Sequence, residues 1–134
     1  MSDSEKVAQS FGRCVFKGDV IERFYDIFID SHPDIKPRFS STDFTSQKRL
    51  LRHGIGLAIM FAGDNPVGKN GIDRIRKSHG DPGLDIPAYL YPYWKQAFLQ
   101  AVSEFDAEFS EELRGRWDKV LQKTIDHVCG GHEA

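Results

Sequence analysis

The chain contains little cysteine and no long apolar stretch. Its two cysteines, Cys14 and Cys129, make neither a disulfide framework nor a metal-ligand spacing, so we expect both to act as small hydrophobic side chains. No apolar run reaches about 18 residues, the length typical of a membrane-spanning helix. The first residues, Met-Ser-Asp-Ser-Glu, are acidic and polar, unlike a secretory signal peptide. These absences predict a cytoplasmic protein that does not enter membranes.

An excess of charge of one sign is also missing. The 18 Lys and Arg residues and the 20 Asp and Glu residues are spread along the chain, and the formal net charge is −2. This distribution argues against a nucleic-acid-binding face and against a basic patch for anionic membranes. A chain of 134 residues is long enough for one domain with its own hydrophobic core, so we predict a single domain over residues 1–134.

Strand patterns are missing as well, because the apolar residues recur with a helical period. The sequence therefore predicts an all-α fold, with helices over about 4–15, 18–31, 43–62, 72–79, 85–105 and 110–129. Two prolines restrict residues 33–39 to a tight corner of one or two turns. The glycines between residues 63 and 71 predict a flexible loop. Asp85 is expected to cap the fifth helix, and Pro92 to kink or restart it.

A histidine ends the short helix over residues 72–79. Ile72, Ile75 and His79 are spaced i, i+3 and i+7, so they share one helical face. Gly80 follows as a stop signal, and Pro82 prevents continuation. Two interpretations remain open at this point. The imidazole could simply be favoured by the helix dipole, or it could be the axial ligand of a buried metal cofactor.

Two further polar residues lie on apolar helical faces. Gln47 begins the main apolar stripe of the long helix, and Tyr25 lies on the apolar face of the second helix. Because the loop between the long helix and the short one reverses the chain, we expect Gln47 and His79 near the open end of a helical hairpin. A buried phenol needs a hydrogen-bond partner, which either Gln47 or a ligand bound between them could supply.

These residues resemble a pattern of the globin family, most closely the bacterial single-domain haemoglobins and the haem domain of flavohaemoglobins. The resemblance is carried by Phe24-Tyr25, His32-Pro33-Asp34-Ile35-Lys36-Pro37-Arg38-Phe39, Gln47, Leu51 and His79. The separations also match, with 14 residues from Tyr25 to Phe39, 8 from Phe39 to Gln47 and 32 from Gln47 to His79. The likeness extends over essentially the whole chain and includes the order of the helices.

The resemblance implies a three-on-three helical sandwich around haem b, with the iron held by His79 as proximal ligand. It also implies that Phe39 stacks on the porphyrin and that Tyr25, Gln47 and Leu51 line the gas side. Oxygen held by ferrous iron carries partial negative charge, so the Tyr25 hydroxyl and the Gln47 amide could donate hydrogen bonds to it. We therefore expect tight oxygen binding with slow release.

On the proximal side, the resemblance implies weaker assignments. Ser78 either accepts a hydrogen bond from the proximal imidazole or is simply solvated. Tyr89 either resembles the tyrosine of flavohaemoglobins that pairs with a glutamate beside the proximal histidine, or is a plain core residue. The last helix carries Asp126, His127 and Cys129 where that glutamate would be needed. The remaining residues expected to pack on the proximal face of the haem are Ile75, Leu84 and Ile86.

The function implied is reversible binding of O2, NO and CO at a five-coordinate haem iron. Three roles fit this chemistry: oxygen binding or delivery, removal of NO, and gas sensing through a separate partner protein. An NO dioxygenase would need a separate reductase to restore ferrous iron. From other classes, a haem-free helical interaction module and a globin-like fold with a different chromophore also fit an all-α chain.

Overall fold

The computed structural model describes residues 2–79 and 87–129, and for residues 75–79 and 129 the backbone alone. Six α-helices and two short 3-10 helices follow one another, and no strand occurs within these ranges. The predicted all-α fold is confirmed. The elements are α1 (Asp3–Lys17), α2 (Val20–Asp30), η1 (Lys36–Phe39), α3 (Phe44–Ala62), α4 (Pro66–His79), η2 (Ala88–Leu90), α5 (Tyr91–Phe105) and α6 (Glu111–Cys129).

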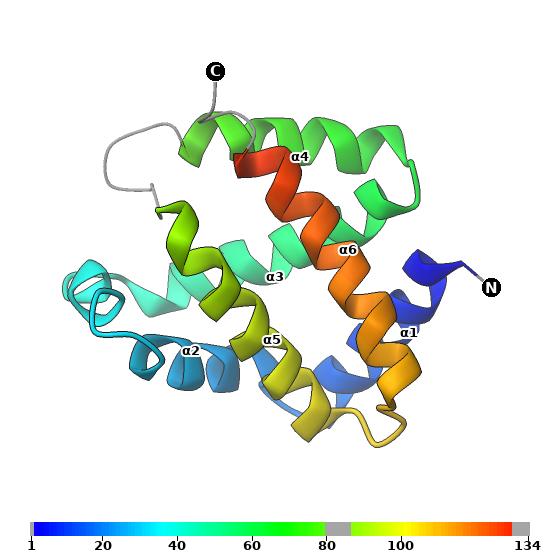
Figure 1. The fold of residues 1–134 in the computed structure, drawn as a ribbon, viewed down its shortest axis with the longest axis horizontal. Coiled ribbons are helices and arrows are strands. Elements are labelled where there is room, and N and C mark those ends of the chain that lie inside the picture. The colour runs from blue at the N-terminus through cyan, green and yellow to red at the C-terminus, as the bar shows by residue number, and fades with distance from the viewer. Residues whose placement is uncertain (1, 80–86, 130–134) are drawn as a thin grey trace.

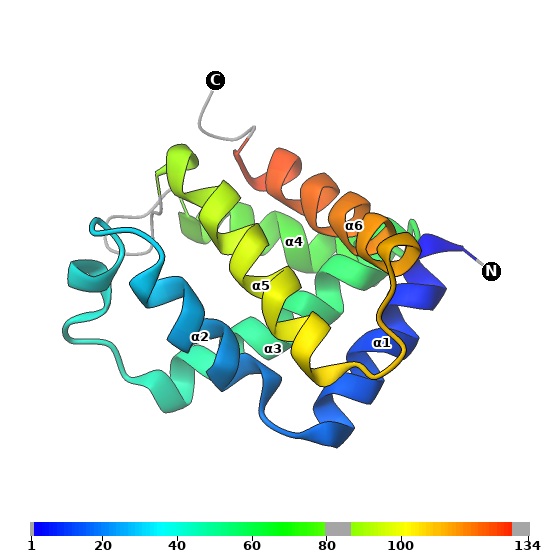
Figure 2. The ribbon, with the colours of Figure 1, turned by 60° about the horizontal axis from the view of Figure 1, so that its bottom comes forward.

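The helices form two crossed layers (Figures 1 and 2). In one layer α3 contacts both α1 and α4, and in the other α5 contacts both α2 and α6. Contacts of α6 with α1, α3 and α4, and of α2 with α3, join the two layers. Large aromatic side chains fill the centre: the rings of Phe24, Phe98 and Trp117 are fully buried, and Phe24 stacks on Phe28 at 5.2 Å. Trp94 stacks on Phe98 at the edge of this core.

Side chains cap the starts of several helices. Ser2 caps α1, Asp19 caps α2, and Asp43 caps α3 by accepting a hydrogen bond from the Thr45 amide at 3.1 Å. The corner over residues 33–39 contains a single 3-10 turn, because Pro37 in the first turn allows no long helix there. Pro87 lies before η2 and outside a helix, so the predicted fifth helix is interrupted there, and Asp85, which was expected to cap it, lies outside the described residues. Instead α5 starts at Tyr91, with Pro92 in its first turn, which confirms the expected restart.

The loop predicted over residues 63–71 is wrong beyond Asn65, because α4 already begins at Pro66. Asn65 promotes this start by accepting a hydrogen bond from the Val67 amide at 2.9 Å. A Cβ atom on Gly68 would lie 2.4 Å from the Phe61 nitrogen, and one on Gly71 would lie 2.6 Å from the Leu57 side chain. These glycines therefore allow α4 to pack closely on α3 rather than making the segment flexible.

Replacing Gly68 with alanine is expected to destabilise the fold by about 1–3 kcal/mol, because the new methyl group meets backbone atoms of α3 that cannot move aside freely. Gly115 in α6 is the matched control, since a Cβ atom there meets nothing within 4 Å. Gly115→Ala should stabilise the protein by roughly 0.5–1 kcal/mol through helix propensity alone. Urea denaturation of both variants measures the difference, and equal effects of the same sign would contradict this packing account.

A buried polar network joins α1 to the junction of α5 and α6. Asp106 is 3% exposed, and its carboxylate accepts hydrogen bonds from Ser10 Oγ at 2.6 Å and from Arg13 Nε at 2.6 Å. Trp117 Nε1 donates to Ser10 Oγ at 2.9 Å. Burial acts to raise the pKa of the Asp106 carboxyl, but the hydrogen bonds from Arg13 and Ser10 outweigh it and leave the pKa below its ordinary value. This carboxylate is therefore ionised inside the fold at neutral pH.

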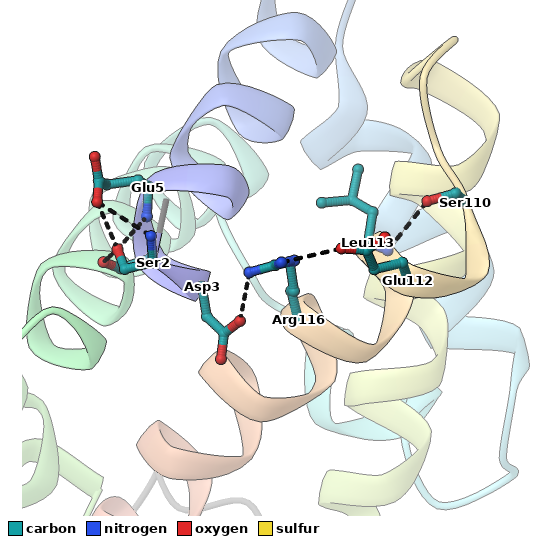
Figure 3. A network of polar contacts seen from close by, with 8 residues as sticks. Ser2, Asp3, Glu5, Ser110, Glu112, Leu113 and Arg116 are labelled. Carbon is teal, nitrogen blue, oxygen red and sulfur yellow. Dashed lines mark hydrogen bonds and ion pairs between the residues drawn. The ribbon is translucent and has the colours of Figure 1, made fainter.

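A second, exposed network fastens the start of α1 to α6 (Figure 3). Arg116 donates to Asp3 at 2.9 Å and to Glu112, one turn before it in α6, at 3.0 Å. Ser2 and Glu5 complete a capping box, in which the Glu5 amide donates to Ser2 Oγ and the Ser2 amide donates to Glu5, both at 3.2 Å. These contacts close the end of the molecule opposite the open end of the α3–α4 hairpin.

Candidate functional site

Tyr25 lies in the part of α2 that is apolar around most of its circumference. The neighbouring Phe24 points into the central core, while the Tyr25 ring lies against the α2–α3 connection and is only 5% exposed. It makes edge contacts with the rings of Phe39 at 5.9 Å and Phe44 at 5.6 Å. Aromatic rings at the end of η1 and at the start of α3 therefore flank the phenol.

The polar end of Tyr25 meets the polar residue predicted for this site. Burial raises the pKa of the Tyr25 phenol to about 12, and a side-chain hydrogen bond with Gln47 acts in the opposite direction. The phenol is thus uncharged at neutral pH and can donate its proton. The middle of α2 and the first turns of α3 therefore lie close together at this pair.

The cap at Asp43 sets the start of α3 and therefore the position of Gln47, one turn into the helix. It is half-buried, and Leu51 follows one turn later on the same side of the helix, half-buried against the core cluster that also contains Tyr25. Phe39, at the end of η1, packs against this cluster too. Four predicted residues from three elements are therefore brought together: Tyr25, Phe39, Gln47 and Leu51.

His79 is the last residue of α4, which lies beside α3 (Figure 1). The two helices are joined by residues 63–65 and run in opposite directions, so the end of α4 and the start of α3 lie at the same end of the hairpin. Ile72, which begins the stripe leading to His79, is fully buried. The side chains of Ile75, Ser78 and His79, and the whole of Leu84 and Ile86, lie outside the described residues.

Tyr89 lies at the surface rather than in the hydrophobic core. It is 52% exposed, so the interpretation as a plain core residue is wrong. Its hydroxyl donates to Asp34 Oδ2 at 2.6 Å, and this hydrogen bond to a carboxylate raises the pKa of the phenol. The physical reason is η2, a single turn after Pro87 that carries Tyr89 outward to the corner between α2 and η1.

The other histidines whose side chains are described have no part in this cluster. His53 is exposed on α3, His32 packs its ring edge-on to Tyr93 at 4.9 Å, and His127 Nε2 lies 2.6 Å from Asp73 Oδ1. Within the described ranges no group of three or more His, Cys, Asp or Glu side chains could hold a metal ion. No helix in those ranges is both long and apolar enough to span a membrane.

This chain is similar to a protein of known structure. No family model matches the sequence, and no curated protein matches it. One solved structure is similar over nearly the full length of both chains: it covers 97% of this chain and 98% of its own, with 35% sequence identity and a TM-score of 0.89. It is the crystal structure of a protein from Pseudomonas aeruginosa PAO1, described as structurally highly homologous to a human hemoglobin.

Proposed function

Because the chain belongs to the globin family, we propose that it holds haem b and reversibly binds a diatomic gas, with O2 as the principal ligand. The observation that carries the proposal is the buried Tyr25 phenol, which packs on Phe39 and lies close to Gln47 at the open end of the α3–α4 hairpin. We propose His79, which ends α4, as the iron ligand opposite this pair.

The residues present fit such a group. A flat macrocycle needs apolar side chains against its face, and Phe39 and Leu51 are half-buried apolar residues beside the hydrogen-bonding pair. Leu50, the neighbour of Leu51 and three residues after Gln47, is 64% exposed. An apolar side chain in this position would gain from being covered by the edge of a bound cofactor. When bound, haem would supply an iron atom with one open coordination position.

The protein's own residues would stabilise the bound gas. The uncharged Tyr25 phenol and the Gln47 carboxamide each offer a donor to a gas ligand that carries partial negative charge. Leu51 keeps the remaining surface apolar and excludes water. A gas ligand held by these donors would dissociate slowly. Slow dissociation favours retention of O2 over its rapid release.

The proposal is tested by oxygenating the ferrous protein. Haem-loaded protein reduced under argon should change to the spectrum of an oxygenated haem protein when air is admitted, and return when argon is restored. A matched sample exposed to CO should give a third, stable spectrum. Oxidation to the ferric form within the mixing time would contradict reversible oxygen binding.

Removal of NO is a second proposed role, and the same pair of donors favours it. Oxygen retained by Tyr25 and Gln47 would persist long enough to meet NO, and O2, NO and one electron together give nitrate. Repeated turnover then depends on a separate reductase. Nitrate should accumulate when NO is added to oxygenated protein supplied with NADH and a flavin reductase, whereas protein without haem should yield only background nitrate.

A further inference from the structure

A cationic groove lies on the outer side of α3, away from the buried face that carries Leu51. It has a volume of about 360 Å³ and runs between α3 and the junction of α1 with α2. Its apolar side is formed by Val15, Val20 and Ile21, and its other side by Lys48, Arg49 and Arg52. The function proposed above does not use this surface.

The charge of the groove is unlike that of the chain as a whole. The protein carries a formal net charge of −2, yet α3 contains no acidic residue between Phe44 and Ala62. Lys48 is engaged across the groove, with Nζ 3.2 Å from Asp19 and 3.8 Å from Glu22. Arg49 and Arg52 are exposed one turn apart. Their guanidinium groups can receive carboxylates in a bidentate geometry.

An exposed aromatic ring lies at the same junction. Phe16, in the last turn of α1, is 94% exposed, more than any other large hydrophobic residue whose side chain is described. Phenylalanine and arginine are enriched in protein–protein interfaces. A lone exposed apolar residue needs no explanation, but the chain neighbour of Phe16, Val15, lines the groove.

We propose that this groove docks the acidic face of an electron-donor protein. The assignment rests on the proposed function, since ferric haem would become ferrous again by taking one electron from a reduced flavin or iron–sulfur carrier, which is itself oxidised by one electron. Because Lys48 adjoins Gln47 in α3, the docked carrier would contact the helix that lines the gas site. An anionic membrane fits less well, because the surface is concave and a flat bilayer would reach its cations less well than a convex protein surface.

Binding of a plant-type ferredoxin, an acidic iron–sulfur carrier, tests the proposal directly by calorimetry at low and high salt. Reversing two charges with Arg49→Glu and Arg52→Glu should weaken binding by about tenfold at low salt. Phe16→Ser should weaken binding by a factor that does not depend on salt. The control variant, Lys6→Glu with Lys119→Glu, changes the net charge by the same amount at a distance and should alter affinity less than twofold. Circular dichroism establishes that each variant is folded.

The outcomes are distinct. Equal weakening by both charge-reversal pairs would overturn the proposal, because only net charge would then matter. So would the absence of ferredoxin binding, or binding of phosphatidylglycerol vesicles through Arg49 and Arg52 without binding of ferredoxin. The calorimetric result does not require haem, so a protein that docks ferredoxin but forms no haem complex would refute the proposed function and leave the docking surface standing.

Discussion

Replacing Tyr25 with phenylalanine is expected to raise the O2 dissociation rate about 10- to 100-fold. A hydrogen bond to a charged acceptor contributes about 1.5–3 kcal/mol, and about 1.4 kcal/mol corresponds to a tenfold change in rate. The phenol is the more deeply buried of the two donors, at 5% exposure, and is held in place by Phe39 and Phe44. Laser photolysis or rapid mixing of the oxygenated protein with CO measures the rate.

Two controls separate this effect from a general disturbance. Tyr93→Phe removes the hydroxyl of a tyrosine that is 39% exposed on α5 and should leave the rate unchanged. Gln47→Leu removes the second donor and should raise the rate as well. An unchanged dissociation rate in Tyr25→Phe would mean that the phenol does not face the ligand, and the assignment of the gas side would be wrong.

The pH dependence of the same rate is a check on the protonation state. Because the pKa of Tyr25 is raised to about 12, the donor proton is retained through the physiological range. The dissociation rate of the unaltered protein is therefore expected to stay flat until alkaline pH approaches that value. A step in the rate near pH 10, the ordinary pKa of tyrosine, would show that the phenol is solvated in the haem-loaded protein.

Asp106→Ala should produce the largest loss of stability, about 3 kcal/mol, because it leaves Ser10 and the Arg13 charge without their buried acceptor. Glu104→Ala is the matched control. Its carboxylate pairs with Arg23 at 2.7 Å, close to the distance in the buried pair, but both side chains are exposed to solvent. Its loss should cost no more than about 1 kcal/mol. Denaturation at pH 7 measures both differences.

The sign of the pH dependence follows from the pKa of Asp106. Because folding lowers this pKa, the carboxylate contributes stability above its ordinary pKa, and the contribution is lost as the pH falls through the lower value in the folded state. The difference between the unaltered protein and Asp106→Ala should therefore shrink in acid, below about pH 4. A difference that stays constant from pH 7 into this range would contradict an ionised Asp106.

The sequence predicted the helices where local chemistry decides their ends. Asp19 and Asp43 precede apolar periodic stretches, so their capping role is visible from the spacing alone. The start of α4 was missed because Gly68 and Gly71 favour a loop in isolation. Their actual role depends on how closely α3 approaches, which is a property of the packed structure.

Polar residues that lie on apolar helical faces can also be recognised from the sequence. Tyr25 and Gln47 stand out because each interrupts an apolar face, and the structure brings the two side chains close together. Ser10 gives an equivalent signal, since it shares the buried face of α1 with Val7 and Cys14, but its partner Asp106 lies 96 positions away at the end of α5. Nothing in the spacing connects these two residues. Tyr89 is a residue whose spacing suggests burial, but a one-turn helix after Pro87 directs its side chain outward.

Titration with hemin tests whether this domain holds haem through His79. The purified protein should bind one equivalent and gain a strong Soret band, His79→Ala should lose this band or bind hemin far more weakly, and the exposed control His53→Ala should behave like the unaltered protein. A protein that stays colourless with hemin, or a His79→Ala variant with the same spectrum and affinity as the unaltered chain, would contradict haem binding through His79.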